Sequence, residues 1–269
     1  MEDGGDSFTP FALLIIDPQA DFHQGGSLAV PGADDDAQRI QNFVEGNLDN
    51  ITNIYVTLDS HQRVHISHPL FWKDANGASP APFTPILHTD VVAGKWMAAD
   101  ETLKAYAEDY TLQLETSSGK FQHIVWPEHC LIGSPGHCVV PPVLAAIHAW
   151  SAHTRKPIRY YWKGTNIRTE MYSVFKAEVP VPGCAETEVN EALVRELVAE
   201  PRVMICGQAL SHCVNFSTRD LLAAWPEGRM DDLTLLAGMS SPVIGFEGQA
   251  VEFLGLLKER GVRVVAEVK

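Results

Sequence analysis

The chain has 269 residues, of which 45% are hydrophobic and 20% are charged, as in ordinary soluble globular proteins. Its formal net charge of −14 argues against nucleic acid and anionic membranes as partners. This length suffices for one sizeable hydrophobic core. We therefore expect a single domain over residues 1–269 that acts on a small molecule.

The start of the chain and its cysteines indicate a cellular compartment. Met1–Asp6 is acidic and lacks the basic and apolar segments of a signal peptide. No apolar run is long enough to span a bilayer. Five scattered cysteines do not predict a disulfide framework. We expect a cytoplasmic protein.

Apolar runs and helical patterns alternate along the chain. Strands are predicted at 11–16, 51–58, 124–126, 158–162, 202–206, 233–236 and 262–266, and helices at 34–47, 100–115, 140–153, 186–199, 214–225 and 247–260. Continuous apolar runs such as 11–16 are typical of strands buried on both faces. The alternation predicts an α/β fold with three α-β-α layers around an open, mostly parallel, Rossmann-like sheet of about six strands. The segment 69–122 interrupts it, and we interpret that segment as an insertion that shapes the mouth of a site.

In open α/β sheets, ligands bind at the carboxyl ends of the strands. The residues at these predicted ends are Asp17, Asp59, Trp126, Lys163 and Cys213. Cys213 is expected at a helix N-terminus, where free backbone N–H groups and the helix dipole favour a thiolate. Asp17 can act as the base and then as the general acid. Lys163 can hold that carboxylate in place and lower the pKa of the thiol.

Two competing patterns lie near these residues. His212 is an alternative base, although its side chain would point about 100° away from that of Cys213 in a helical turn. Cys130, together with His137 and Cys138, suggests a structural zinc site, but the spacing fits no common zinc module. The remaining cysteines need no role beyond ordinary packing.

A metal site is predicted after the second strand. Asp59 and His61 share a face of an extended chain, so both can reach one ion. His65 and His68 follow on the loop, and His129 comes later in the sequence. Nitrogen and carboxylate ligands suit Zn²⁺, Fe²⁺ or Mn²⁺.

Short segments in a fixed order carry a family resemblance. They are Leu14–Phe22, Gly26–Ala33, Asp59–His61, Trp126–Cys130, Lys163–Gly164, Tyr172–Phe175 and Gly207–Val214. With these segments the chain resembles the nicotinamidases, or pyrazinamidases, of the isochorismatase-like cysteine hydrolase superfamily. The resemblance implies an isochorismatase-like fold. It also implies hydrolysis of nicotinamide to nicotinate and ammonia through a cysteine thioester, a reaction of NAD salvage.

The resemblance also implies roles for particular residues. Asp17, Lys163 and Cys213 match the family's catalytic triad. The oxyanion hole would use the backbone N–H groups of Cys213 and Ala209, with a cis peptide bond at Gln208–Ala209. These donors would stabilise the charge that develops on the carbonyl oxygen during acyl transfer.

The ligand-binding residues follow from the same resemblance. One divalent metal ion, zinc by preference and iron or manganese as alternatives, would be held by Asp59, His61 and His129, with His65 as a further ligand. Phe22 and Trp126 match the residues that sandwich the substrate ring, and Tyr172 matches one that lines the pocket. Family members are often oligomers, so we expect a homo-oligomer.

The sequence departs from the family in its substrate-facing parts. The insertion is longer than in compact nicotinamidases, and Gln208 replaces a small apolar residue. The alternative function is therefore a cysteine amidohydrolase for another small amide or carbamoyl compound. An isochorismatase-type hydrolase would lack the nucleophile Cys213, and a catalytically silent binding module would not need all three triad residues.

Overall fold

We describe a computed structural model of the chain, in which residues 10–116 and 122–266 are placed. The acidic start Met1–Asp6 and residues 117–121 of the insertion lie outside the described residues. In the described part of the chain, no helix has the length and apolarity needed to cross a membrane.

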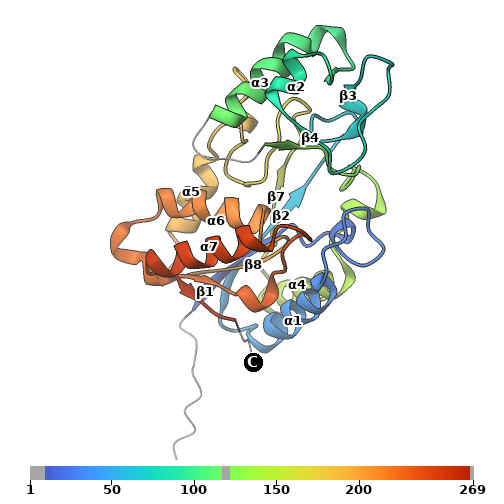
Figure 1. Ribbon diagram of the computed structural model, residues 1–269. Coiled ribbons are helices and arrows are strands. Elements are labelled where there is room, and N and C mark those ends of the chain that lie inside the picture. Colours follow the sequence, from blue (N-terminus) through green and yellow to red (C-terminus); the bar gives the residue numbers. More distant parts are fainter. Residues whose placement is uncertain (1–9, 117–121, 267–269) are drawn as a thin grey trace, which may run out of the picture.

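A six-stranded sheet forms the centre of the molecule, as predicted (Figure 1). Its strand order is β10 (Arg263–Val264), β9 (Leu233–Leu235), β8 (Val203–Gly207), β1 (Phe11–Ile16), β2 (Ile51–Asp59) and β7 (Arg159–Lys163). All neighbouring pairs are parallel. The α/β class and the three-layer arrangement are therefore confirmed.

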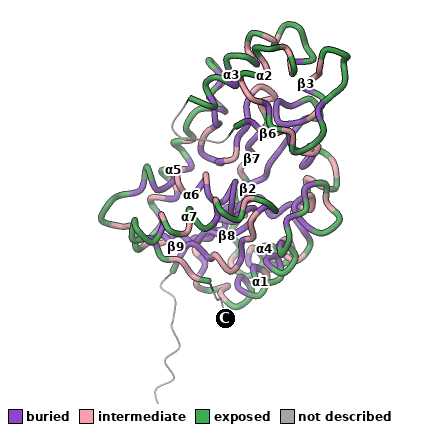
Figure 2. Tube along the Cα trace, in the orientation of Figure 1, coloured by how far each residue is buried: buried purple, intermediate pink, exposed green. Residues whose placement is uncertain are grey.

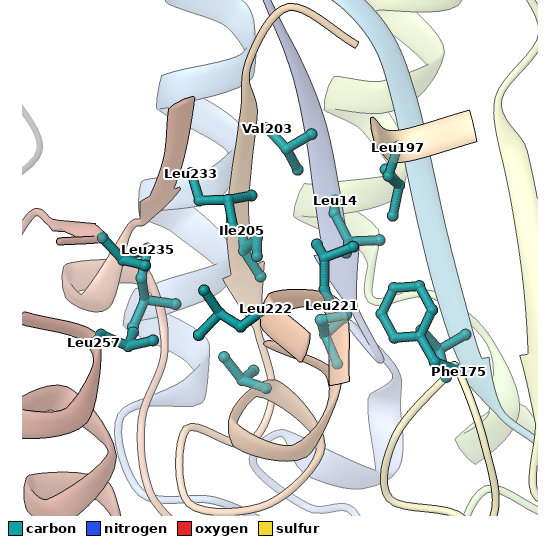
Figure 3. Close-up of a cluster of buried hydrophobic side chains, with 14 of the residues drawn as sticks. Leu14, Phe175, Leu197, Val203, Ile205, Leu221, Leu222, Leu233, Leu235 and Leu257 are labelled. Atoms are coloured by element: carbon teal, nitrogen blue, oxygen red, sulfur yellow. The ribbon is translucent and has the colours of Figure 1, made fainter. Parts of the chain in front are cut away.

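Helices cover both faces of this sheet, which explains why β1 is apolar at every position. One face packs against α1 (Ala33–Gly46) and α4 (Pro141–Thr154), and the other against α5 (Glu191–Val198), α6 (Cys213–Ala224) and α7 (Glu247–Glu259). Successive strand residues point to opposite faces. Leu13 and Ile15 accordingly join the α1/α4 cluster, and Leu14 joins the cluster drawn in Figure 3.

The described part of segment 69–122 forms a lobe beyond the carboxyl edge of the sheet (Figure 1), around a separate hydrophobic cluster to which Ile66, Val125 and Val179 also contribute. It contains the short antiparallel pairs β3 (Trp72–Lys73) with β5 (Met97–Ala98) and β4 (Pro85–Ile86) with β6 (His123–Ile124). The helix α3 (Lys104–Thr116) packs against β5 and β6, and α2 (His88–Val92) packs against α3. Trp72 and Tyr110 lie in the lobe's core, and Figure 2 shows the outer surface of its helices exposed.

Two predicted elements differ from the structure. The strand predicted at 124–126 is β6, which pairs with the insertion and not with the central sheet. The helix predicted at 186–199 begins only at Glu191, because Asn190 caps it by accepting a hydrogen bond from the N–H of Leu193. Short 3₁₀ helices occupy Ala20–Phe22, Pro69–Phe71, Glu101–Leu103, Pro135–His137, Ala185–Thr187, Glu227–Asp232 and Ala237–Met239.

Candidate active site

Four of the predicted strand-end residues meet at the carboxyl edge of the sheet. Asp17 directly follows β1, and Cys213 begins α6 after the turn that follows β8. Asp59 and Lys163 end β2 and β7 and are register partners. The strand order reverses beside β1, because β2 and β7 lie on one side of it and β8 and β9 on the other. Such a switch point leaves a crevice where ligands bind in α/β sheets.

Lys163 connects these residues. Its buried ammonium lies 3.0 Å from Asp17 Oδ2, 2.9 Å from Asp59 Oδ1 and 3.6 Å from the sulfur of Cys213. It also donates to the carbonyl oxygen of Met171 at 2.9 Å. Burial alone would lower the pKa of Lys163, but the two carboxylates outweigh it and hold that pKa well above its usual range. The ammonium therefore stays charged and links the thiol to two acids.

Asp17 is held in place by Thr57 on β2. The Thr57 hydroxyl donates to Asp17 Oδ1 at 2.5 Å and accepts the backbone N–H of Asp17 at 3.0 Å. Asp17 has a left-handed φ of 42°, which turns the chain sharply at the end of β1. Desolvation raises the pKa of its carboxyl, while Lys163 opposes that rise. A buried carboxylate with a raised pKa is suited to accept and return a proton.

Cys213 lies at the helix N-terminus, as predicted, and is 6% exposed. Burial raises the pKa of its thiol well above the usual range, and the nearby charge of Lys163 only partly opposes this. In the free protein, burial thus opposes the thiolate that the helix terminus is expected to favour. The thiol needs a base to remove its proton, and the Asp17 carboxylate is the nearby candidate, because both groups contact the ammonium of Lys163.

The turn before Cys213 requires a glycine. Gly207 has a φ of 117°, and a Cβ atom at this position would collide with the carbonyl oxygen of Ile16. The peptide bond Gln208–Ala209 that follows is cis, as the resemblance implied. Ala209 and Cys213 both line the same pocket. The close packing of β8 against β1 thus brings the two expected oxyanion-hole residues to one cavity.

A cluster of buried histidines surrounds Asp59. Asp59 Oδ2 lies 3.0 Å from His61 Nε2 and 3.2 Å from His129 Nε2. Ring nitrogens of His61, His68 and His129 lie within 4.8 Å of one another. The structure thus brings the three predicted ligands together and adds His68 to them.

The cluster fits a divalent metal ion chemically. His61 Nδ1 is buried and has no hydrogen-bond partner among the described residues. Burial lowers the pKa of His68 to about 2, which leaves it in the neutral form that binds metals. His65 is also buried, but its Nδ1 lies 2.5 Å from the hydroxyl of Ser67 and it is not part of the three-histidine group. His68 lies within the three-histidine group, whereas His65 lies outside it and its buried Nε2 has no hydrogen-bond partner among the described residues.

A pocket joins the thiol to this cluster. Its free volume is about 30 Å³, and its lining includes Cys213, Asp59 and His129. Phe22, Trp126 and Tyr172 line it as well, as the resemblance implied. The indole N–H of Trp126 donates to the Tyr172 hydroxyl at 3.0 Å, which orients both rings. A concave pocket with aromatic walls and few polar groups is typical of a small-molecule site.

Trp126 reaches this pocket from a loop and not from the end of a central strand. Its backbone N–H donates to the carbonyl oxygen of Ser67 at 2.7 Å, so the loop that contains Ser67 holds it in place. Three consecutive apolar residues at 124–126 resemble a strand, but only the first pairs with β4. The position of Trp126 depends on this long-range contact, which the local pattern does not contain.

The competing sequence patterns are not supported as functional sites. The His212 ring packs against those of Trp126 and Tyr172, and burial lowers the pKa of His212 to about 3. His212 therefore forms part of the pocket wall and is a poor base. Cys130 is buried whereas Cys138 is exposed. Within the described ranges, the three-histidine group is the one set of side chains whose ligand atoms lie close enough together to hold a metal ion.

Sequence reasoning missed one polar residue of the pocket. Glu170 lies among the lining residues and is 4% exposed. It precedes the segment Tyr172–Phe175 that supports the family resemblance, but a single acid in a polar loop carries no distinctive pattern. Gln19 was also overlooked as a support. Its side chain bonds both the N–H and the carbonyl of Asp59, each at 2.7 Å.

Comparisons with known proteins establish the fold. No family model matches the sequence, and no curated protein does. Among solved structures, the chain is similar to the yeast nicotinamidase, with a TM-score of 0.65 and 19% identity over 95% of this chain and 99% of that one. It is also similar to a nicotinamidase/pyrazinamidase of Acinetobacter baumanii, with a TM-score of 0.63 and 19% identity over 96% of this chain and 97% of that one. For a zinc complex of a Pyrococcus horikoshii pyrazinamidase the TM-score is 0.56, with 21% identity over 95% and 98% of the two chains. The chain therefore has the fold that these nicotinamidases and pyrazinamidases share.

Proposed function

We propose that the chain is a nicotinamidase, which hydrolyses nicotinamide to nicotinate and ammonia. The observation that carries this proposal is the position of Lys163, whose ammonium lies within 3.0 Å of the carboxylates of Asp17 and Asp59 and 3.6 Å from the Cys213 sulfur. The ammonium of Lys163 thereby links a nucleophile and its base to Asp59 and the histidines around it, the residues proposed to bind a metal ion. The similarity in fold to nicotinamidases supports the same reaction class.

The reaction begins with a proton transfer. Asp17 takes the proton of the Cys213 thiol, and the sulfur attacks the carboxamide carbon. The backbone N–H groups of Ala209 and Cys213 stabilise the negative charge that forms on the oxygen. Asp17 then gives the proton to the departing nitrogen, so that ammonia leaves and a thioester remains.

Water completes the cycle. Asp17 removes a proton from a water molecule, which attacks the thioester carbon, and the thiolate leaves as nicotinate forms. The thiolate takes the proton back from Asp17. Lys163 keeps its charge throughout. It stabilises the Asp17 carboxylate and the Cys213 thiolate in turn, because its ammonium contacts both groups.

The substrate ring is held by the rest of the pocket. Phe22 and Trp126 would contact its faces, and Tyr172 would close the side. Asp59, His61, His129 and His68 would hold one divalent ion, zinc by preference. When bound, such an ion supplies a ligand position for the ring nitrogen and so fixes the orientation of the carboxamide.

Two further properties are part of the proposal. The five cysteines are unpaired, which suits a cytoplasmic location. A homo-oligomer is expected from the resemblance alone. Gel filtration with light scattering tests the assembly.

Ammonia release tests the function. Zinc-supplemented protein is expected to release ammonia and nicotinate from nicotinamide in equal amounts, and a chelator should abolish this. Cys213→Ala should be inactive yet folded. Cys206→Ala is the matched control, because Cys206 is a buried cysteine on β8 that faces the α1/α4 side of the sheet. An active Cys213→Ala enzyme would refute the mechanism. Ammonia from other small amides but not from nicotinamide would favour the alternative amidohydrolase.

A further inference from the structure

Gln208 forms a buried hydrogen bond between the turn before Cys213 and the helix α1. Its side-chain NH₂ group donates to Asp36 Oδ2 at 2.9 Å. Both residues are 1% exposed, and neither is among the residues that line the pocket of Cys213. Gln208 also replaces the small apolar residue of the family, so this bond is a feature of this chain. Any influence of Gln208 on the reaction therefore acts through the turn and not through contact with the substrate.

Asp36 is a fixed partner for this bond. It lies in the first turn of α1, and its backbone N–H donates to the carbonyl oxygen of Gly32 at 3.0 Å. Its other carboxylate oxygen, Oδ1, lies 2.6 Å from a guanidinium nitrogen of Arg39. One oxygen of this buried carboxylate is thus bound within α1 and the other by the turn. Hydrogen bonds to an ionised acceptor are about twice as strong as neutral ones, so α1 holds the Gln208 side chain firmly.

Two backbone hydrogen bonds hold the same turn on either side of Ala209. The N–H of Gln208 donates to the carbonyl oxygen of Ile16 at 2.8 Å. The N–H of Leu210 donates to that of Ser241, also at 2.8 Å. The N–H of Ala209 itself donates to no other backbone group within residues 10–116 and 122–266. Ala209 lines the pocket, and its N–H is one of the two donors assigned above to the substrate oxygen.

We propose that Gln208 is a positioning residue for the oxyanion hole, because its bond to Asp36 helps to set the direction of the peptide group that carries the Ala209 N–H. The inference rests on the proposed amidase function, in which this N–H stabilises the charge on the substrate oxygen. A peptide group is planar, so the residues at its two ends set its direction. The Gln208 side chain anchors one end to α1, and an apolar residue at this position would lack that anchor.

Gln208→Met tests this role, because methionine keeps the length of the side chain and lacks the donor. We expect kcat for nicotinamide to fall by about 10- to 100-fold, the factor that corresponds to losing a hydrogen bond to a charged group. KM should change by less than about 3-fold, because the contact is made in the transition state and the ring is bound elsewhere. Arg39→Met is the matched control: it removes the other partner of Asp36, on a side chain that is 44% exposed, and its kcat should stay within about 2-fold of the wild-type value.

Asp36→Asn tests the same bond from α1, and it serves as the test if circular dichroism shows that Gln208→Met does not fold. It keeps the shape of the side chain and an acceptor oxygen but removes the charge, so kcat should fall by about 5-fold. In folded Gln208→Met protein the same change should have no further effect on kcat, because the bond is already absent. An unchanged kcat in the folded variants at these two positions, or an equal fall in Arg39→Met, would overturn the role of Gln208.

An aldehyde gives a readout that does not depend on amide hydrolysis. With pyridine-3-carbaldehyde, the Cys213 sulfur bonds to the carbonyl carbon, the C=O π bond opens, and its oxygen takes the thiol proton. That oxygen occupies the place of the proposed oxyanion. The Kd of the aldehyde in calorimetry should therefore rise in Gln208→Met by a factor similar to the fall in kcat. The Kd of nicotinamide for Cys213→Ala protein should be the same with and without Gln208→Met.

The two proposals fail in different ways. If no amide yields ammonia but the aldehyde shows this difference, the amidase proposal fails and the positioning role of Gln208 stands. An equal aldehyde Kd in the wild-type and folded Gln208→Met proteins would overturn that role, even if nicotinamide is hydrolysed. A weaker binding of nicotinamide by the same factor as the aldehyde would also overturn it, because the substitution would then have disturbed the whole pocket.

Discussion

Thr57 offers a direct test of how the fold holds the proposed base. It is fully buried and exchanges two hydrogen bonds with Asp17, one through the carboxylate and one through the backbone N–H. Thr57→Val removes the hydroxyl and keeps the shape of the side chain. The change therefore leaves both groups of Asp17 without that partner and opens no cavity.

The expected cost follows from these two bonds. A hydrogen bond to a charged group contributes about 1.5–3 kcal/mol, and a buried N–H left unpaired costs about 1–3 kcal/mol. The added methyl group offsets about 0.8 kcal/mol through burial. We expect Thr57→Val to lower the free energy of unfolding by about 2–5 kcal/mol, a large share of the total for a domain.

The loss should depend on pH. The pKa of Asp17 in the folded protein is raised above its usual value, and the bond from Thr57 acts to lower it. Without that bond the pKa rises further. The destabilisation is therefore full at a pH above the folded pKa, where the carboxylate is charged, and shrinks as the pH falls through that pKa.

Urea unfolding followed by circular dichroism measures this effect at pH 8 and at pH 5. Thr57→Ser is the control, because it keeps the hydroxyl and loses only a methyl group, at a cost of about 1 kcal/mol. Equal stability of the Val and Ser variants at pH 8 would refute the reasoning. The Val variant should also show a lower kcat for nicotinamide, since its base is no longer held.

Three other changes have expected outcomes. Gly207→Ala should lower the free energy of unfolding in urea by about 2–5 kcal/mol, because of the positive φ and the contact with the carbonyl of β1. Gly255→Ala is the control: it lies in the middle of α7 with open space around its Cβ position, so it should raise that free energy by about 0.5–1 kcal/mol. Similar values for both would contradict the geometry. Lys163→Met leaves the carboxylates of Asp17 and Asp59 buried without their cation, so it should lower the free energy of unfolding by about 3–5 kcal/mol near neutral pH and by less in acid. An unchanged Tm in a thermal melt at pH 8 would count against these ion pairs. Zinc at about 100 times its Kd should stabilise the wild-type protein by about 2.7 kcal/mol in calorimetry but not His129→Ala; an equal rise in Tm for both would place the ion elsewhere.

Much of the fold could be predicted because its signals are local. The run Phe11–Ile16 is apolar at every position, which indicates two covered faces, and the structure places helices on both. Because parallel strands end at one edge, the polar residues Asp17, Asp59 and Lys163 had to lie near one another once the strands were assigned. The metal group was predicted in part from the spacing of Asp59 and His61.

The failures involve residues whose environment is set by distant parts of the chain. The helix expected from 186 starts at Glu191, because Asn190 is the residue that caps it. Trp126 is held by the loop at Ser67 and not by a central strand. The sequence named His65 and His68 on the same loop, and only the folding of that loop brings His68 into the histidine group. Glu170 enters the pocket from a loop whose polar composition gave no distinctive signal.

The sequence by itself determined the α/β class, four of the five strand ends and the chemical types of the groups gathered there, because apolar periodicity and chain direction are local properties. The tertiary structure decided the protonation state of the site's ionisable side chains and which residues contact one another there. Whether Cys213 is a thiol or a thiolate depends on burial, which raises its pKa, against the charge of Lys163 brought from a strand three positions away in the sheet. Desolvation and Coulomb interactions depend on distances between residues far apart in sequence, and only the folded chain sets those distances.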